Sequence, residues 1–120
     1  MKNFTLQAFL LVSLIGSDSA LAETVRIASW NIANMAAEPG QALRGHERSK
    51  EVYEQIRETI RSLDADIIAL QEIGSIPGAK SVLGPDYQVN FETRCLENAK
   101  SCLEDNDDIY TAIAVRNSIA

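Results

Sequence analysis

Two segments of the chain end in side chains that can bind a metal ion through oxygen. Residues 25–32 read Val-Arg-Ile-Ala-Ser-Trp-Asn-Ile and carry Asn31 near their end, whereas residues 66–72 read Asp-Ile-Ile-Ala-Leu-Gln-Glu and end on Glu72. A carboxylate oxygen suits Mg²⁺, Mn²⁺ or Ca²⁺, and an amide can add a neutral oxygen ligand or a hydrogen bond to a phosphate. Taken alone, a glutamate at a strand end is usually solvated and an asparagine there usually caps a turn. Brought together, Asn31 and Glu72 would form half of a divalent-metal site, so both are candidate catalytic and metal-binding residues.

The elements around these two residues have clear hydrophobic patterns. Residues 25–32 alternate with a period of two, which predicts a strand, and residues 67–70 are apolar on both faces, which is typical of a central, doubly covered strand. Between them, from about His46 to Leu63, we expect an amphipathic helix packed on a sheet. Its apolar positions recur in steps of four, four and three: Val52, Ile56, Ile60 and Leu63. A membrane-surface helix is the alternative, but its polar face is not basic enough.

The second half of the chain predicts two more strands. Residues 87–91 and 109–116 alternate, whereas residues 74–84 contain glycine and proline and read as a loop. Residues 94–108 read as a polar loop. The resulting order of strand, helix and three strands predicts a mixed α/β layer structure.

The first residues have the order of a secretory signal peptide. Lys2 gives a positive start, residues 9–15 form an apolar core, and Ala20-Leu21-Ala22 is a small-x-small cleavage site. The apolar run is too short to cross a bilayer, which needs about 20 residues. A buried N-terminal helix is the alternative. We place the cut after Ala22, so residues 1–22 are the predicted signal peptide and the mature chain is expected to be secreted or periplasmic, with no stable membrane anchor.

The charge balance limits the possible partners. The formal net charge is −6, and removing residues 1–22 takes away one lysine and one aspartate, which leaves it unchanged. An acidic surface does not attract nucleic acid through bulk charge, because phosphate binding depends on clustered lysine and arginine. It is still compatible with an enzyme that cuts phosphodiesters, since a bound cation can supply positive charge locally.

An acidic run occupies residues 104–108, which read Glu-Asp-Asn-Asp-Asp. A Ca²⁺ loop is one interpretation, but the glycine and the distal glutamate of an EF-hand are absent. A solvated acidic turn is the prediction.

The two cysteines, Cys95 and Cys102, are separated by six residues. Exported chains meet oxidising conditions, where such a pair can form a disulfide worth about 2–3 kcal/mol by loop-closure entropy. A zinc site is the rival interpretation, but no histidine lies nearby. The spacing also differs from the Cys-x-x-Cys of redox pairs. A structural disulfide is therefore predicted.

A family resemblance runs over nearly the whole mature chain. Residues 27–32, Ile-Ala-Ser-Trp-Asn-Ile, followed by a helix and then by residues 63–72, Leu-Asp-Ala-Asp-Ile-Ile-Ala-Leu-Gln-Glu, resemble the opening of the endonuclease/exonuclease/phosphatase family. That family includes pancreatic-type deoxyribonucleases, abasic-site endonucleases, inositol polyphosphate phosphatases and bacterial sphingomyelinases. The Gln-Glu end of the second strand is the more specific element. Residues 111–116 also resemble the family's next core strand.

The resemblance implies both a fold and a reaction. The fold would be α+β, a four-layer α/β/β/α sandwich with mixed, mostly antiparallel sheets, of which the first half is present. Glu72 would be the metal-binding carboxylate, and Asn31 would help to hold the metal or the scissile phosphate. The reaction would be attack of water on a phosphate ester, with nucleic acid among the substrate classes, assisted by Mg²⁺ or by Mn²⁺ or Ca²⁺.

The sequence departs from the family pattern after Glu72. Family members complete the site with a base histidine paired to an aspartate, an Asp-x-Asn pair and a late Asp-His, all from the second half of the domain. The single histidine here is His46, which precedes Glu72 and is expected to face solvent. We therefore expect residues 23–120 to be the N-terminal half of such a domain and to be inactive without the other half. The alternative is a non-catalytic secreted scaffold domain or an inactive truncated product.

Overall fold

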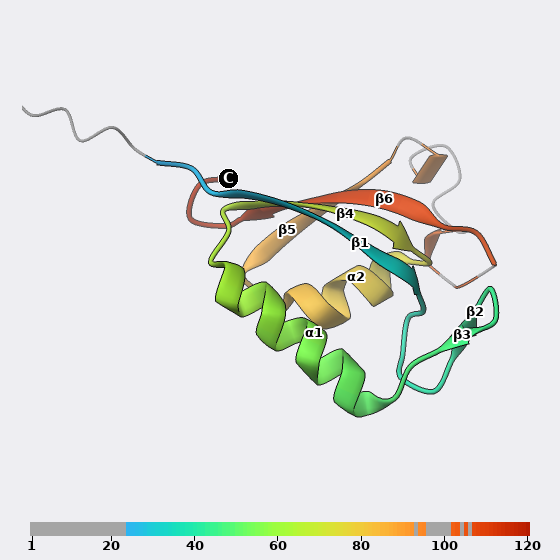
Figure 1. Cartoon of the computed structure of the whole chain (residues 1–120). Helices are drawn as coiled ribbons and strands as arrows, with labels where there is room; N and C mark the ends of the chain where they lie inside the picture. Colours follow the sequence, from blue (N-terminus) through green and yellow to red (C-terminus); the bar gives the residue numbers. More distant parts are fainter. Residues whose placement is uncertain (1–23, 93, 96–101, 104, 106) are drawn as a thin grey trace, which may run out of the picture.

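A four-stranded sheet and two helices form two layers in the computed structural model, with both helices on one face of the sheet (Figure 1). The structure describes residues 24–92, 94–95, 102–103, 105 and 107–120, so the predicted signal peptide lies outside the described residues. The strand order is β1-β4-β6-β5. The strands are β1 (Ile27–Met35), β4 (Ile67–Ile73), β6 (Tyr110–Arg116) and β5 (Tyr87–Phe91).

The sheet is mixed. β1 pairs with β4 in parallel, whereas β4 with β6 and β5 with β6 are antiparallel. This confirms the predicted α+β class with a mixed, mostly antiparallel sheet. It also confirms the strands predicted at residues 87–91 and 109–116, the second of which begins one residue later. β4 is central, as its apolar run predicted.

Helix α1 (Lys50–Leu63) crosses from β1 to β4, as its stripe of apolar residues predicted. It begins four residues later than predicted, because His46 belongs instead to a small hairpin of β2 (Ala42–Leu43) and β3 (His46–Glu47). Ile56 and Ile60 are buried, as expected, but Leu63 is 40% exposed. The helix buries Tyr53 instead, whose hydroxyl donates to the Ala36 carbonyl oxygen at 2.6 Å.

Helix α2 (Ile76–Leu83) occupies the segment that was predicted to be a loop, so that prediction is wrong. The side chain of Ser75 caps the helix and accepts a hydrogen bond from the Gly78 N–H at 3.3 Å. Pro77 lies in the first turn, where its missing N–H costs no intrahelical hydrogen bond. Gly78 suits the close packing here, because a Cβ at this position would lie 3.1 Å from the Ala36 carbonyl oxygen, a tight contact. Proline and glycine thus mark the start of a helix here.

The core lies between the helices and one face of the sheet. The side chains of Ile68, Leu70 and Ala114 from the sheet are fully buried and pack with residues of α1 and α2. On the opposite face of the sheet, Ile27 is 72% and Ile113 is 51% exposed. The described residues therefore provide one helical layer and one sheet, and cover only one face of that sheet.

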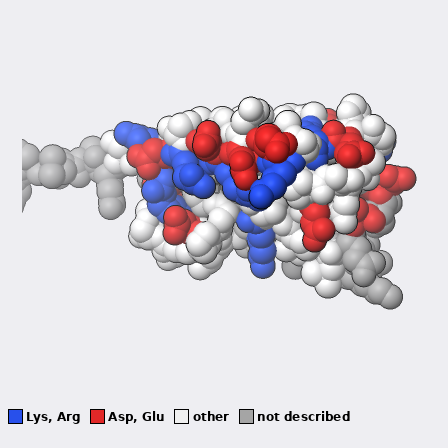
Figure 2. All heavy atoms as spheres, turned by 90° about the horizontal axis from the view of Figure 1, so that it is seen from below, with Lys and Arg blue, Asp and Glu red and all other residues white. Residues whose placement is uncertain are grey.

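The helical layer has a mixed surface. Seen from below, lysine and arginine side chains lie among aspartate and glutamate side chains (Figure 2). In this view acidic side chains border the basic ones, which fits a solvated helix better than one bound to an anionic membrane surface. Among the described residues, no helix is long and apolar enough to cross a membrane.

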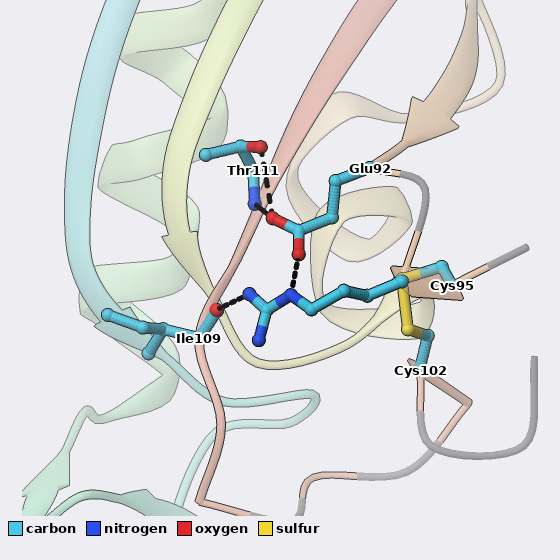
Figure 3. The surroundings of a disulfide bond; sticks show 6 residues. Glu92, Cys95, Cys102, Ile109 and Thr111 are labelled. Atoms are coloured by element: carbon cyan, nitrogen blue, oxygen red, sulfur yellow. Dashed lines mark hydrogen bonds and ion pairs between the residues drawn. A yellow bond between two sulfur atoms is a disulfide. The ribbon is translucent and has the colours of Figure 1, made fainter. Parts of the chain in front are cut away.

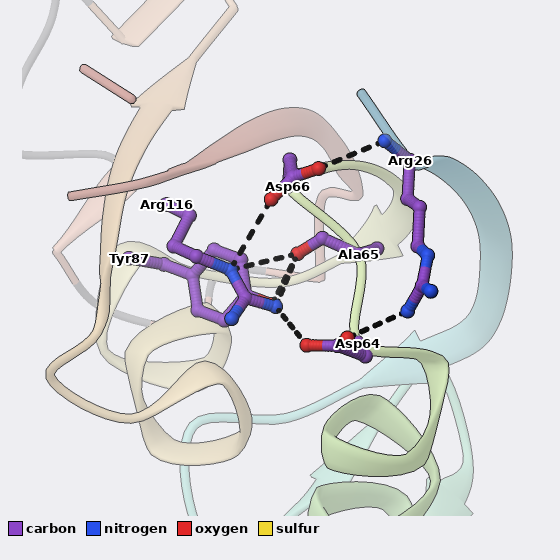
Figure 4. Close-up of polar contacts among 6 residues, drawn as sticks. All are labelled: Arg26, Asp64, Ala65, Asp66, Tyr87 and Arg116. Atoms are coloured by element: carbon purple, nitrogen blue, oxygen red, sulfur yellow. Dashed lines mark hydrogen bonds and ion pairs between the residues drawn. The ribbon is translucent and has the colours of Figure 1, made fainter. Parts of the chain in front are cut away.

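One end of the sheet, where β1 and β4 begin, is closed by ion pairs (Figure 4). Asp64 accepts from Arg26 Nη1 at 2.6 Å and from Arg116 Nη2 at 2.9 Å. Arg116 Nε also lies 3.6 Å from Asp66 Oδ1, and its guanidinium lies 5.7 Å from the centre of the Tyr87 ring. The hydrogen bond to Asp64 raises the pKa of Arg116. We call this end, with Arg26, Asp64, Asp66 and Arg116, the ion-paired end.

Candidate functional site

Asn31 and Glu72 meet at the other end of the sheet, and their side chains are in contact. Because β1 and β4 are parallel, their C-terminal ends share one edge, and Asn31 lies opposite Gln71 in the register. Asn31 Nδ2 donates to Glu72 Oε1 at 2.8 Å. The structure therefore brings together the two residues that the sequence singled out. We call this edge the Asn31–Glu72 end.

A bulge determines how Glu72 is presented. The pairing of β4 with β6 shifts register between Leu70 and Ile73, and Glu72 has a left-handed φ of 59°. Leu70 and Ile73 are buried, whereas Glu72 is half-buried. Regular alternation would place Glu72 on the same face as Ile68 and Leu70, but the bulge interrupts the alternation at this point. The left-handed conformation costs a non-glycine residue roughly 1–2 kcal/mol, and it leaves the carboxylate beside Asn31.

A turn after Asn31 fixes the orientation of its amide. Asn31 Oδ1 accepts from the Ala33 backbone N–H at 2.9 Å, while Ala33 and Asn34 have left-handed φ values of 58° and 54°. Asparagine commonly bonds to the backbone two residues ahead in this way. A backbone N–H can only donate, so the amide oxygen must face Ala33 and the amide nitrogen must face the carboxylate. In this arrangement Asn31 orients Glu72 through a neutral hydrogen bond.

The carboxylate of Glu72 keeps capacity for a further ligand. Its Oε1 accepts from Asn31, and within the part of the chain that the structure describes Oε2 has no hydrogen-bond or ion-pair partner. Asn31 itself is exposed. Nearby, Gln71 Nε2 donates to Ser29 Oγ at 3.2 Å, which links the same two strands one residue earlier. The site is therefore a solvent-accessible pair with one unused carboxylate oxygen.

The donor chemistry fits a hard divalent cation in part. A carboxylate oxygen suits Mg²⁺, Mn²⁺ or Ca²⁺, which bind about six or more oxygens. Glu72 could supply one or two of these. Asn31 Oδ1 already accepts from the Ala33 N–H, and its second lone pair could face a cation. Among residues 24–92, 94–95, 102–103, 105 and 107–120, no three His, Cys, Asp or Glu side chains come together as a metal-binding group. The pair therefore provides a partial ligand set.

His46 is not part of this pair. It lies on β3, in the hairpin before α1, and is exposed as expected. Its ring has no hydrogen-bond partner among the residues described. Nothing in its surroundings marks it as a general base.

The predicted disulfide is confirmed and lies at the same end of the sheet. Cys95 and Cys102 are bonded with an S–S distance of 2.06 Å, and both are buried. The register places Tyr110, at the start of β6, opposite Ile73 at the end of β4. The disulfide packs with Tyr110, so it anchors the end of β5 and the start of β6 beside the end of β4.

Polar contacts reinforce this disulfide region (Figure 3). Glu92 forms an ion pair with Arg94 and accepts from the Thr111 backbone N–H at 3.0 Å and from Thr111 Oγ1 at 3.1 Å. Arg94 Nη2 donates to the Ile109 carbonyl at 3.0 Å, and its guanidinium lies 4.9 Å from the centre of the Tyr110 ring. The hydrogen bond from Arg94 is the main cause that lowers the pKa of Glu92. Arg94 therefore links the segment just after β5 to the segment just before β6.

The acidic run after the disulfide binds the backbone as well as facing solvent. Asp105 Oδ2 accepts from the Ala37 N–H at 2.8 Å, and Asp107 Oδ1 accepts from the Arg44 N–H at 3.2 Å. Asp107 and Asp108 are exposed, as expected for a solvated turn, whereas Asp105 is half-buried; residues 104 and 106 of the run lie outside the described residues. Gly74 allows the close approach, because a Cβ there would lie 2.7 Å from Asp105 Oδ1. These contacts tie Asp105 and Asp107 to the segment between β1 and α1.

Arg48 is the site residue that sequence reasoning missed. It precedes α1, and its guanidinium donates to carbonyl oxygens in the segment that follows Asn31. No spacing in the sequence identifies such a contact, because it depends on where the turn after β1 places its carbonyls.

No family model, no curated protein and no solved structure gives a significant match to this chain, so the candidate site is defined by the geometry of Asn31 and Glu72 alone.

Proposed function

We propose that this chain is the N-terminal part of an exported hydrolase of phosphate esters that depends on a divalent metal ion. The observation that carries the proposal is the contact between Asn31 and Glu72, at 2.8 Å, where two parallel strands end at one accessible edge. The resemblance of residues 27–32 and 63–72 to the endonuclease/exonuclease/phosphatase family supports the same reading.

The two side chains would have separate roles. Glu72 would bind the cation through its carboxylate, which already has one oxygen held by Asn31 and the other without a partner among the described residues. Asn31 would keep that carboxylate in one orientation, since a second hydrogen bond from Ala33 fixes its own amide. A bound divalent ion neutralises charge on a phosphoryl group and assists attack by water. The remaining ligands and the base would come from further parts of the protein.

The substrate class follows from the same chemistry. Nuclease, phosphodiesterase and phosphatase activities all use a hard cation on a phosphate ester. A chain with a net charge of −6 would rely on that cation to attract the substrate, because it lacks the excess of basic residues that binds nucleic acid. Export is supported by the signal-like N-terminal sequence and is compatible with the disulfide. An extracellular nuclease or a phosphate-scavenging enzyme is the resulting proposal.

The test is an assay of the full-length protein encoded by the open reading frame. Double-stranded DNA, RNA, a phosphodiester chromogen and an inositol phosphate would be incubated with and without Mg²⁺. Glu72→Gln removes the charge but keeps an oxygen that can accept from Asn31, so it separates metal binding from the local hydrogen bond. We expect the metal-dependent rate of this variant to fall by more than about 100-fold. The control is Glu54→Gln, on the solvent-facing side of α1, which should retain that rate.

Two outcomes would contradict the proposal. One is the absence of metal-dependent turnover on all of these substrates by a folded full-length protein. The other is turnover that Glu72→Gln leaves unchanged. Either result would favour the alternative, a secreted scaffold domain without catalysis.

A further inference from the structure

Arg48 binds the segment that directly follows Asn31 in the chain. Its Nη1 donates to the Asn34 carbonyl at 3.0 Å, and its Nη2 donates to the Ile32 carbonyl at 2.7 Å and to the Ala33 carbonyl. One guanidinium thus contacts three consecutive carbonyl groups. The side chain is half-buried, and the Arg48 carbonyl in turn accepts from the Gly40 N–H at 2.9 Å.

These carbonyl groups need partners because the strand pairing is interrupted there. β1 pairs with β4 up to Asn31 and again at Met35, and no register partner is assigned to the three residues between. Ala33 and Asn34 are left-handed, which turns their carbonyls away from a regular strand ladder. Backbone carbonyls that are removed from water require a donor from elsewhere in the protein. Arg48 supplies that donor for the buried Ile32, and it also bonds the carbonyls of the half-buried Asn34 and the exposed Ala33.

The guanidinium has no carboxylate partner within the described part of the chain. The ion pairs formed there involve Arg26, Arg94 and Arg116. Arginine presents several donors in a planar fork, which suits simultaneous contacts to several oxygens. Lysine has one ammonium group and cannot reproduce this geometry.

A second contact fixes the same segment further along. The buried hydroxyl of Tyr53 donates to the Ala36 carbonyl at 2.6 Å. Burial raises the pKa of Tyr53 to about 12, so this hydroxyl remains a donor throughout the neutral range. Arg48 and Tyr53 therefore hold residues 32–36 at two points. The contacts of Arg48 are the ones nearer to Asn31 in the chain.

We propose that Arg48 is a positioning residue for the Asn31–Glu72 pair. The contacts form an unbroken series: Arg48 holds the left-handed turn, the turn places the Ala33 N–H, that N–H fixes Asn31 Oδ1, and Asn31 Nδ2 holds Glu72 Oε1. Loss of Arg48 should therefore release the Asn31 amide and, with it, the orientation of the carboxylate. The role in metal binding rests on the proposed function, whereas the positioning of Asn31 does not.

The experiment compares Arg48→Met and Arg48→Lys with a matched control in the full-length protein. The control is Arg57→Met, because Arg57 Nε also donates to a backbone carbonyl, that of Ser81, at 2.7 Å, but contacts α2 instead of the turn after β1. The first readout is the side-chain amide resonances of Asn31 and their exchange with solvent, measured by NMR without metal. We expect faster exchange and shifted resonances in Arg48→Met, a smaller change in Arg48→Lys, and no change in Arg57→Met.

The second readout is Mn²⁺ affinity, measured by calorimetry on the same proteins. We expect Arg48→Met to weaken binding by about 10–100-fold, the range found when groups that orient metal ligands are removed, and Arg57→Met to leave it unchanged. If the Asn31 resonances in Arg48→Met match those of the unmodified protein, the positioning role is overturned. The same conclusion follows if both methionine variants lose stability equally and keep Mn²⁺ affinity.

The two proposals fail in different ways. If the unmodified protein binds no Mn²⁺ and hydrolyses no phosphate ester, the proposed function fails, and the Asn31 resonances still decide the role of Arg48. Should Arg48→Met not fold, Arg48→Lys gives the same comparison with its charge retained. Faster Asn31 exchange in Arg48→Lys than in the unmodified protein would support the proposal, and equal exchange would overturn it.

Discussion

Asp64 and Glu72 lie at opposite ends of the sheet, and their carboxylates have opposite kinds of partner. At the ion-paired end, Asp64 contacts two arginines and Asp66 lies 3.6 Å from one of them, so positive charge offsets both groups. At the Asn31–Glu72 end, the contact to the carboxylate comes from a neutral amide. An arginine partner neutralises a carboxylate, whereas an amide orients it and leaves its charge for a cation. The partner, more than the position at a strand end, distinguishes a structural carboxylate from a candidate ligand.

The largest effect that would sharpen this comparison is stabilisation by metal. A cation that binds only the folded state at 1,000 times its dissociation constant raises the free energy of unfolding by about 4 kcal/mol. We expect Mg²⁺ or Mn²⁺ to raise the melting temperature of the full-length protein, and Glu72→Gln to abolish that rise. Asp64→Asn should keep it, despite a lower melting temperature without metal. Equal loss of the metal effect in both variants would show that the two ends do not differ as described.

The next effect concerns the disulfide beside the Asn31–Glu72 end. Replacing Cys95 and Cys102 together by serine should lower the free energy of unfolding by about 2–3 kcal/mol, because a short closed loop is released in the unfolded state. Chemical denaturation measures the loss. Native-state hydrogen exchange should rise at the end of β5 and the start of β6, while amides at the ion-paired end change less. Equal increases at both ends would contradict a local role for the disulfide.

The smallest expected effect is on how the free energy of unfolding depends on pH, and it comes from Glu92. Arg94 holds the pKa of Glu92 below its unfolded value, which is about 4.3. The resulting stability is present above that value and is lost as the pH falls through the lowered pKa of the folded state. In Glu92→Gln the free energy of unfolding should therefore fall less steeply as the pH drops below about 4. Near neutral pH its dependence on pH should hardly change. Denaturation midpoints from pH 2 to 7 measure this, and an unchanged acid profile would argue against the ion pair.

Much of the fold could be predicted from the sequence because its elements have strong periodicity. The alternation in residues 87–91 and the apolar stripe of α1 both reflect burial on one face, and burial is what a periodic pattern reports. Helix α2 was missed because Pro77 and Gly78 are read as loop residues. Proline at a helix start and glycine at a close contact with Ala36 are features of local geometry that composition does not distinguish from a loop.

The candidate site was predicted in its residues but not in its geometry. Asn31 and Glu72 were chosen because each ends an apolar strand, and the parallel pairing of β1 and β4 brings them together. The bulge at Glu72 was not predictable, since an alternating pattern assumes regular pairing. Arg48 was missed for a related reason: its carbonyl partners exist only because the turn after Asn31 leaves the strand ladder.

The continuous path from β1 through α1 to β4 affects when the contact between Asn31 and Glu72 can form during synthesis. Asn31 and Glu72 lie 41 residues apart within one strand-helix-strand unit, and β5 and β6 both follow it in the chain. During synthesis this unit leaves the ribosome before the rest of the sheet exists, and its contacts close a shorter loop than any between β1 and the later strands. The order of translation therefore favours assembly of the carboxylate and its amide first. The later strands would then add to a pair that is already in place.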